Sequence, residues 1–453
     1  MPSSTPAKLS VLVLAYYYPP DNTSGVFRTL YFFNHIARRQ HFDISILTLA
    51  RESYRSDQSM DMRLNAQIDP GIKVYRARAI HFREAVISLK NRLGRKGISS
   101  ESRESDSVVK SAEECRRAGL WSRCKDIFTE ELLAFPDDKT GWLPFAFREA
   151  RRIIKGKKIN IIYSTGSPWS SHLLGFLLNK IYGIPLILDY RDPWYGNPYA
   201  ADDRSSLYKK ASFALEKKII ARAARVICNT ERLREFYAET FGHPEKFLTI
   251  HNGFEPALAQ GKKKKSPGGP FTLVHAGSLY GGRNPDNFVQ AVVNLSRRGA
   301  NTPPLRVILV GAGDETKKRI IEQYGREVYD RYFLVTPRLS HDQCLQYLLL
   351  ADVLLLFQQG TALQVPRKLF EYVGLQKPVL AICDGGETED IIQANTFGVS
   401  VRDEIEPIED ALLHMLHSGK LSGPTSTSQR FTNTRLSQKL EMIFSDCLDR
   451  GDV

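Results

Sequence analysis

Short apolar runs alternate with amphipathic stretches along most of this chain. The first run, Leu9–Tyr16, is too short for a helix of ordinary length and is typical of a buried strand. The stretch that follows repeats apolar residues at helical spacing, with Val26, Leu30, Phe33 and Ala37 on one face. Because strands that alternate with helices build parallel, doubly wound sheets, the pattern predicts an α/β fold.

The apolar runs form two successive series. The first series comprises Leu9–Tyr16, Phe42–Thr48, Ile72–Ala77, Ile159–Ser164, Pro185–Asp189, Arg225–Cys228 and Phe247–His251. The second comprises Phe271–His275, Leu305–Val310, Tyr332–Val335, Val353–Phe357 and Val379–Cys383. Each series opens with a strand, a loop containing glycine and a helix. We therefore expect two Rossmann-like, doubly wound domains that face each other across a cleft.

Composition shifts indicate where the domains end. Lys262–Lys265, followed by Ser-Pro-Gly-Gly-Pro, has the character of a linker, which predicts an N-terminal domain over residues 1–258 and a C-terminal domain over 259–430. A segment at about 81–135 fits neither series and is expected to be an insertion. It begins with an amphipathic stretch that would either pack on the sheet or bind a membrane surface.

We expect residues 431–453 to form a helix that packs back on the N-terminal domain.

The length of 453 residues agrees with two or three domains. Hydrophobic residues make up 42% and charged residues 25%, which is typical of a globular protein. No apolar run reaches the roughly 18–20 residues that a membrane-spanning helix needs. We expect no secretory signal, and we interpret the six scattered cysteines as reduced thiols, which predicts a cytoplasmic location.

The net charge of +13 has three possible explanations: a solvated surface, an anionic membrane, or nucleic acid. Because no nucleic-acid-binding motif is evident, we predict no nucleic-acid partner. Attraction to anionic lipid or to a phosphate-bearing substrate is the preferred interpretation.

The run Gln364–Tyr372 carries the most specific chemistry. It follows a predicted strand, and ligands bind at the carboxyl ends of strands in open parallel sheets. Arg367 and Glu371 share a helix face at i, i+4, and Lys368 lies beside them. A helix N-terminus and two cations favour an anion, and a carboxylate can accept hydrogen bonds from two ribose hydroxyls. The run therefore predicts a site for a nucleoside diphosphate.

Further runs occur in a characteristic order along the chain. They are Tyr18-Pro19-Pro20 with Gly25 and Arg28, Ser164 with Pro168 and His172, Asp189–Trp194, Asn252–Phe254, His275–Ser278 with Arg283, Gly311–Gly313, and Pro366 with Lys368, Glu371, Tyr372, Lys377 and Pro378. Together they make the chain similar to the retaining glycosyltransferases of family four, which have the GT-B fold. The resemblance covers nearly all of the chain except residues 81–135.

The resemblance implies transfer of a hexosyl group from a nucleoside-diphosphate sugar to an acceptor hydroxyl, with retention. It assigns acceptor binding to the N-terminal domain and nucleotide-sugar binding to the C-terminal domain. We expect a carbohydrate or lipid-linked acceptor. We also expect a role in the synthesis of cell-surface polysaccharide or glycolipid, and a place at the inner face of the cell membrane. No cofactor is expected. No obligatory metal is expected either, because no Asp-x-Asp motif ends a strand and Asp202-Asp203 lacks the middle residue.

For the donor, the resemblance implies that Arg283 and Lys368 clamp the diphosphate and that Glu371 binds the ribose, with Arg367 beside it. The ordinary alternatives are a surface salt bridge for Arg283, a solvated helix face for Lys368, and a simple ion pair between Glu371 and Arg367. Many family members have a second glutamate eight residues before the first, and here that position is Leu363.

The glycine loops and the first domain supply the remaining candidates. Gly25 would let the backbone approach the donor, or would be a plain turn glycine. The resemblance also assigns Gly277 to the donor site. His172 would face the sugar, or would be a structural histidine. Asp192 would orient the acceptor or support His172, or would cap a turn or pair with Arg191.

Other functions remain open at this point. A sugar-nucleotide epimerase of the same fold would share Glu371 and the diphosphate site. A non-catalytic nucleotide-binding scaffold would agree with Leu363. A basic nucleic-acid binder would agree with the charge alone.

Overall fold

A computed structural model describes most of the chain. The described residues are 8–55, 58–81, 131, 133–198, 204–256, 268–279, 282–297, 304–418, 423–424 and 426–449. Most of the predicted insertion at 81–135, most of the predicted linker and Asp202-Asp203 lie outside these residues.

The first sheet of the described chain has seven strands in the order β3-β2-β1-β4-β5-β6-β7. Its strands are β1 (Leu9–Leu14), β2 (Phe42–Leu49), β3 (Lys73–Ala77), β4 (Ile161–Gly166), β5 (Leu186–Tyr190), β6 (Arg225–Cys228) and β7 (Phe247–Thr249). The pairs from β3 through to β5 are parallel. In β1, all residues from Val11 to Leu14 are buried, as expected for a strand covered on both faces.

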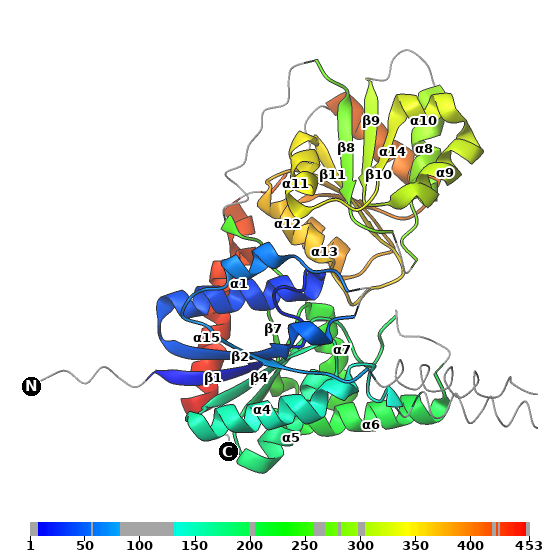
Figure 1. The fold of residues 1–453 in the computed structure, drawn as a ribbon. Coiled ribbons are helices and arrows are strands. Elements are labelled where there is room, and N and C mark those ends of the chain that lie inside the picture. Colours follow the sequence, from blue (N-terminus) through cyan, green and yellow to red (C-terminus); the bar gives the residue numbers. More distant parts are fainter. Residues whose placement is uncertain are drawn as a thin grey trace, which may run out of the picture. The chain divides into compact units, whose positions relative to one another are not determined.

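Helices cover both faces of this sheet (Figure 1). Helix α1 (Ser24–Arg39) lies on one side, and α4 (Leu143–Gly156), α5 (Ser170–Tyr182) and α6 (Ser206–Arg222) lie on the other. Helix α7 (Glu231–Phe241) precedes β7.

The second sheet has six strands in the order β10-β9-β8-β11-β12-β13 within the described residues. They are β8 (Phe271–Ala276), β9 (Leu305–Val310), β10 (Phe333–Thr336), β11 (Val353–Gln358), β12 (Val379–Cys383) and β13 (Gly398–Val401). Its neighbouring strands pair in parallel.

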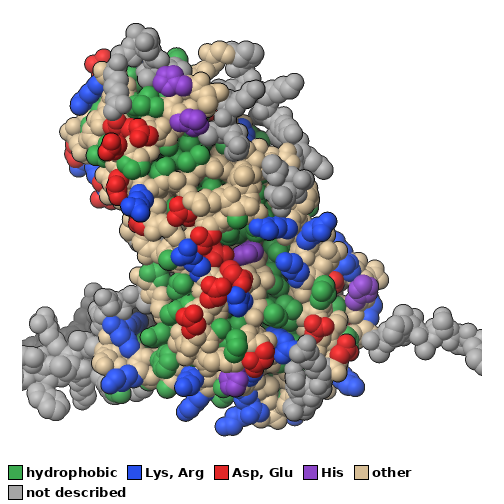
Figure 2. Space-filling view, turned by 180° about the vertical axis from the view of Figure 1, so that it is seen from behind, with side chains coloured by type: hydrophobic (Ala, Val, Ile, Leu, Met, Phe, Trp, Pro, Cys, Tyr) green, Lys and Arg blue, Asp and Glu red, His purple; other side chains and the backbone are tan. Residues whose placement is uncertain are grey.

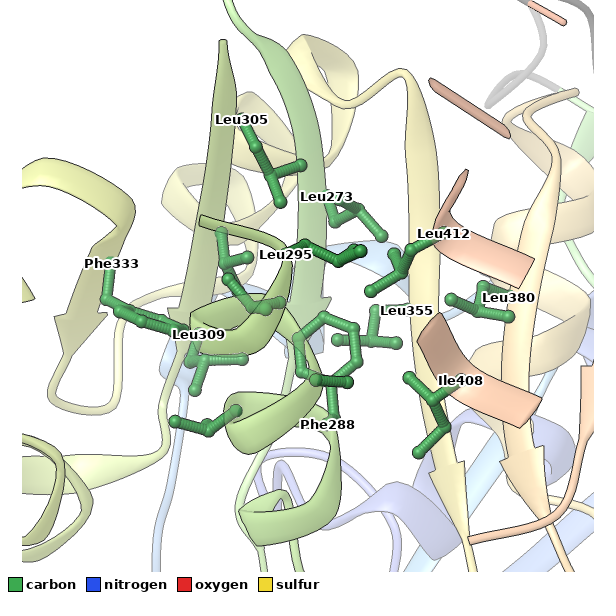
Figure 3. Packing of buried hydrophobic residues seen from close by; sticks show 14 of the residues in the cluster. Leu273, Phe288, Leu295, Leu305, Leu309, Phe333, Leu355, Leu380, Ile408 and Leu412 are labelled. Carbon is green, nitrogen blue, oxygen red and sulfur yellow. The ribbon is translucent and has the colours of Figure 1, made fainter. Parts of the chain in front are cut away.

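Alternate side chains of these strands enter two separate hydrophobic cores. Leu273 packs with Phe288 of α8 and Leu412 of α14, and Figure 3 shows this cluster from close by. The next residue, Val274, packs in the second cluster with residues of α12 such as Leu369. The helices around this sheet are α8 (Asp286–Arg297), α9 (Gly313–Tyr324), α10 (Arg326–Tyr332), α11 (His341–Leu350), α12 (Arg367–Gly374), α13 (Glu387–Asn395) and α14 (Ile405–Ser418).

The chain divides into two compact units. One contains residues 1–196, 200–226 and 444–453, and the other contains residues 197–199 and 227–443. The last helix, α15 (Asn433–Asp449), therefore begins in the second unit and ends in the first. No described helix is both long and apolar enough to span a bilayer.

The predicted fold class, two doubly wound parallel sheets with flanking helices, is confirmed. The sequence analysis missed one edge strand, β13. Its four residues are all half-buried, so they lack the continuous apolar run that marks the interior strands. The predicted strand Tyr332–Val335 is shifted by one residue because Tyr332 ends α10.

The end of α15 completes the core of the first unit. Phe444 is fully buried, and its ring lies against Phe33 of α1, Phe42 of β2 and Tyr163 of β4, with centroid distances of 6.4, 5.6 and 6.0 Å. A helix distant in sequence thus fills the space between α1 and the sheet.

We expect Phe444→Ala to lower the free energy of unfolding by about 3–5 kcal/mol, because it removes a buried aromatic ring and leaves a cavity. Met442 lies on the same helix with 64% of its surface exposed, so Met442→Ala should change stability by less than about 0.5 kcal/mol. Denaturant unfolding of both variants measures the difference. Equal losses would contradict the packing role of Phe444.

Candidate functional site

The second sheet has a topological switch point between β8 and β11. These strands are neighbours, but the chain continues from β8 to β9 on one side and from β11 to β12 on the other. Loops that leave the carboxyl ends of two such strands diverge, and ligands of open α/β sheets bind there. The loop after β8 contains Gly277, and the loop after β11 leads into α12 with Lys368 and Glu371.

Gly277 provides the space that the Lys368 side chain occupies. A Cβ atom built on Gly277 would lie 1.4 Å from Lys368 Nζ and 2.5 Å from Lys368 Cε. The backbone of Gly277 also has a φ of +141°, which L side chains rarely adopt. Position 277 therefore needs glycine for two independent reasons, and the ammonium group lies directly against the backbone of the loop.

Burial and the neighbouring Arg283 together lower the pKa of Lys368 to about 8. Arg283 reaches the site from the loop before α8, and its Nη2 atom donates a hydrogen bond to Gln358 Oε1 at 2.8 Å. Gln358 is the last residue of β11 and is 1% exposed. Two cations are thus held close together at the switch point. Such an arrangement favours an anionic ligand.

Tyr372 anchors α12 to the sheet. Its hydroxyl accepts a hydrogen bond from the backbone N–H of Ala276 at 3.0 Å and donates one to the carbonyl of Leu355 at 3.4 Å. Because Lys368 and Glu371 lie on the same helix, this anchor sets their positions relative to the ends of β8 and β11.

Glu371 is 9% exposed and is ionised in this setting. Burial acts to raise the pKa of Glu371. A hydrogen bond from His341 and the charges of Arg367 and Lys368 outweigh it and lower the pKa to about 2. His341 Nε2 lies 2.7 Å from Glu371 Oε1, and Arg367 Nη2 lies 4.0 Å from Glu371 Oε2.

The structure therefore brings together five residues that the sequence proposed: Gly277, Arg283, Arg367, Lys368 and Glu371. Pro366 is the N-cap residue of α12. Sequence reasoning missed His341 and Gln358. Both come from elements that lie far from Glu371 and Arg283 in the sequence, so no local spacing indicates the contacts.

The remaining predicted residues lie in the first unit: Gly25 and His172 in the first turns of α1 and α5, and Asp192 on the loop after β5. A Cβ atom on Gly25, in the first turn of α1, would lie 1.7 Å from Arg191 Nη1. Arg191 Nε donates to the carbonyl of Gly166 at 3.2 Å, and its Nη2 donates to the carbonyl of Ser167. Gly25 thus makes room for the Arg191 guanidinium, a role that sequence reasoning missed.

His172 is fully buried. Its Nδ1 lies 2.8 Å from Ser164 Oγ, and its ring lies 4.6 Å from that of Tyr190. Burial lowers the pKa of His172 to about 3, so the imidazole is neutral at physiological pH. Its Nε2 has no hydrogen-bond partner among the described residues, and it lies 2.5 Å from a Cβ built on Gly166. Asp192, half-buried, follows Arg191 on the loop after β5.

Arg28, a member of the N-terminal run, is buried against Asp189 at the end of β5. Its Nη2 atom lies 2.8 Å from Asp189 Oδ1, and Thr165 Oγ1 donates to Asp189 Oδ2 at 3.1 Å. This pair joins α1 to the sheet beside His172. In the described part of the chain, no group of three or more His, Cys, Asp or Glu residues is placed to hold a metal ion.

Residues 122–258 match the family model described as Glycosyltransferase Family 4. The matched residues, 137 of 453, make up less than a third of the chain. A search of the curated proteins finds no match to it.

Solved structures resemble the chain over nearly all of its length. HepE from Anabaena, in complex with UDP, has 14% identity and a TM-score of 0.58, covering 97% of this chain and 100% of HepE. Sucrose-phosphate synthase from Thermosynechococcus elongatus has 14% identity and a TM-score of 0.62, covering 98% and 100%. A putative UDP-N-acetylglucosamine 2-epimerase from Listeria monocytogenes has 12% identity and a TM-score of 0.56, covering 98% of each chain. These likenesses establish the fold, so the predicted GT-B class is confirmed.

We expect Gly277→Ala to displace the Lys368 ammonium and to weaken binding of inorganic pyrophosphate at least tenfold, roughly the effect of losing one charge-assisted hydrogen bond. Gly325 also has a positive φ, but a Cβ there meets no atom within 4 Å. Gly325→Ala therefore carries the backbone cost alone and is the matched control. Calorimetry on both variants decides the matter, and equal pyrophosphate affinities would contradict this account of Gly277.

Proposed function

We propose that the protein is a glycosyltransferase that moves a hexosyl group from a nucleoside-diphosphate sugar to an acceptor hydroxyl, with retention at the anomeric carbon. The observation that carries the proposal is the arrangement of Arg283 and Lys368 around Gly277, with Glu371 on the next turn of α12. All four residues belong to the second unit, so the argument does not depend on how the two units are arranged.

The cations match the chemistry of the leaving group. When the glycosidic bond breaks, negative charge grows on the diphosphate, and donors aimed at that charge lower the barrier. Arg283 and Lys368 would supply this stabilisation, so we expect no cofactor and no obligatory metal. Lys368 is at the second position of α12, where the backbone N–H groups of the first turn add to the attraction.

Glu371 is suited to the ribose. It is ionised and largely buried, and a carboxylate accepts from two vicinal hydroxyls in a fixed geometry. Arg367 beside it would complete the donor-binding set. Leu363 replaces a second glutamate, so the contacts to the donor sugar would come from other groups.

The first unit would hold the acceptor. Gly25 and His172 lie in the first turns of the helices that follow β1 and β4, and Asp192 lies on the loop after β5. All three are thus at the carboxyl edge, where ligands of parallel sheets bind. We infer a carbohydrate or lipid-linked acceptor in the synthesis of cell-surface polysaccharide or glycolipid. In a front-side displacement, the departing phosphate would take the proton of the acceptor hydroxyl as the new glycosidic bond forms.

A second candidate is epimerisation of a nucleotide sugar, which the structural likeness to the putative Listeria epimerase supports. The likeness to HepE, which was solved in complexes with UDP and with UDP-glucose, supports transfer. Incubating a panel of nucleotide sugars with and without an acceptor library separates the two. Conversion of the donor to an epimer without acceptor would favour the second candidate.

We expect Lys368→Ala and Arg283→Ala each to lower turnover about a hundredfold or more, because each removes a donor aimed at developing charge. Glu371→Ala should mainly weaken binding of free nucleoside diphosphate. Steady-state kinetics, calorimetry and thermal unfolding measure the three effects. Lys318→Ala on the exposed face of α9 is the control. Wild-type turnover in both clamp variants would reject the clamp.

We also propose that the protein works at the cytoplasmic face of the cell membrane, attracted by anionic lipid. Helices α4, α5 and α6 carry ten Lys and Arg residues but only two acidic residues, Glu149 and Glu216. Glu216 is fully buried, and Glu149 is paired with Arg152. Figure 2 shows Lys and Arg side chains spread over the lower part of the face seen from behind, with Asp and Glu side chains among them.

The protein should therefore co-sediment with anionic vesicles at low salt and be released at high salt, since each cation near such a surface contributes about 1 kcal/mol. Reversing two exposed charges, Lys217→Glu with Lys218→Glu on α6, should weaken this binding strongly. The same change at Lys318 and Lys439, two exposed lysines of the second unit, is the matched control. A wild-type protein that stays in the supernatant would refute membrane attraction.

A further inference from the structure

His341 lies in direct contact with the carboxylate that we assign to the ribose. It is the first residue of α11, and its Nε2 lies 2.7 Å from Glu371 Oε1 on α12. Ser340 forms a capping box with Gln343, which fixes the start of α11 and with it the backbone of His341. The contact thus joins two well-defined helices.

This contact restricts the rotation of the Glu371 carboxylate. Its other oxygen, Oε2, is 4.0 Å from Arg367 Nη2, beyond hydrogen-bond range, so Arg367 attracts the group without fixing its plane. A carboxylate needs a defined plane to accept from two neighbouring hydroxyls at once. His341 is the group placed to supply that plane.

The hydrogen bond leaves room for a ligand on the same oxygen. Each carboxylate oxygen has two lone-pair directions, so Glu371 Oε1 can accept from His341 and from a ribose hydroxyl together. Oε2 remains available for the second hydroxyl. The side chain of His341 is 50% exposed, so it borders the site and does not seal it.

We propose that His341 is a positioning residue that orients Glu371 toward the 2′- and 3′-hydroxyls of the donor nucleotide. The inference rests on the proposed function, because it presumes that a nucleoside diphosphate binds at Arg283 and Lys368. It adds a determinant of selectivity for ribose over deoxyribose.

The charge of His341 should also make ligand affinity depend on pH, which gives a second way to test the proposal. The hydrogen bond with Glu371 raises the pKa of His341, although burial opposes the change. The charged groups that act on it are Glu371 and Arg367 from α12 and Asp342 from its own helix. As pH rises through the raised pKa, His341 loses its proton, and the site loses one positive charge beside Glu371. An anionic ligand is then bound less tightly.

Lys368 contributes a separate loss of affinity at higher pH. Its pKa of about 8 means that the ammonium also deprotonates in the alkaline range. His341→Gln keeps a hydrogen-bond donor near the position of Nε2 but cannot titrate. The ratio of wild-type to His341→Gln affinity at each pH isolates the histidine, because the ligand and Lys368 titrate alike in both proteins.

Calorimetry with UDP, ADP and GDP first identifies the nucleotide that the wild-type protein binds most tightly. The test then compares this nucleotide with its 2′-deoxy form in wild type, His341→Ala and His341→Gln. His341→Ala should weaken binding of the ribonucleotide about tenfold, which is the order of one charge-assisted hydrogen bond. It should weaken binding of the deoxynucleotide distinctly less. His341→Gln should keep the preference for ribose. Its nucleotide affinity should be lower than that of wild type, and this difference should shrink as pH rises.

If His341 had a purely structural role, His341→Ala would weaken binding of both nucleotides equally or would lower only the melting temperature. Either result would overturn the inference. His414→Gln on the exposed surface of α14 is the control for loss of a histidine. If His341→Ala does not fold, the pH series with His341→Gln alone tests the inference. A ratio of wild-type to His341→Gln affinity that stays constant with pH would refute the positioning role. A wild-type protein that binds none of the three nucleotides would instead refute the proposed function.

Discussion

The closeness of two positive charges at one glycine determines what the second unit can bind. Lys368 and Arg283 repel each other, and burial removes part of the water that would screen them. Neither side chain can simply swing away. Arg283 is hydrogen-bonded to Gln358 at the end of β11, and Tyr372 ties the helix that carries Lys368 to β8 and β11. The fold thus holds the two charges close together, and a bound anion would offset the repulsion between them.

The two units differ in the electrostatic character of their loops. In the second unit the candidate residues are ionised, with Glu371 held negative beside two cations. In the first unit the central polar group, His172, is neutral and fully buried, and the nearby cation Arg28 is matched by Asp189. This contrast agrees with the proposal that the second unit binds the diphosphate and the first unit binds an uncharged acceptor hydroxyl.

Much of this arrangement is local and could be predicted from the sequence. The strand and helix periodicities gave both sheets, and the i, i+4 spacing placed Arg367 and Glu371 on one face. The topological rule for parallel sheets then brought Gly277 and Lys368 to the same edge. Contacts such as His341 with Glu371 and Arg191 against Gly25 join residues that are 30 and more positions apart. Their register depends on how helices pack after the strands are ordered, and periodicity carries no information about that.

The path of α15 has a consequence for how the protein can be dissected. The first unit is discontinuous, since the second part of α15, from Phe444 onward, belongs to it although the whole second unit precedes that helix segment in the sequence. A fragment that stops at residue 226 would expose an apolar surface on Phe33 and Tyr163 to water. Recombinant production of that half alone would require the missing peptide in trans. During synthesis, the N-terminal half would remain unfinished until the residues of α15 leave the ribosome.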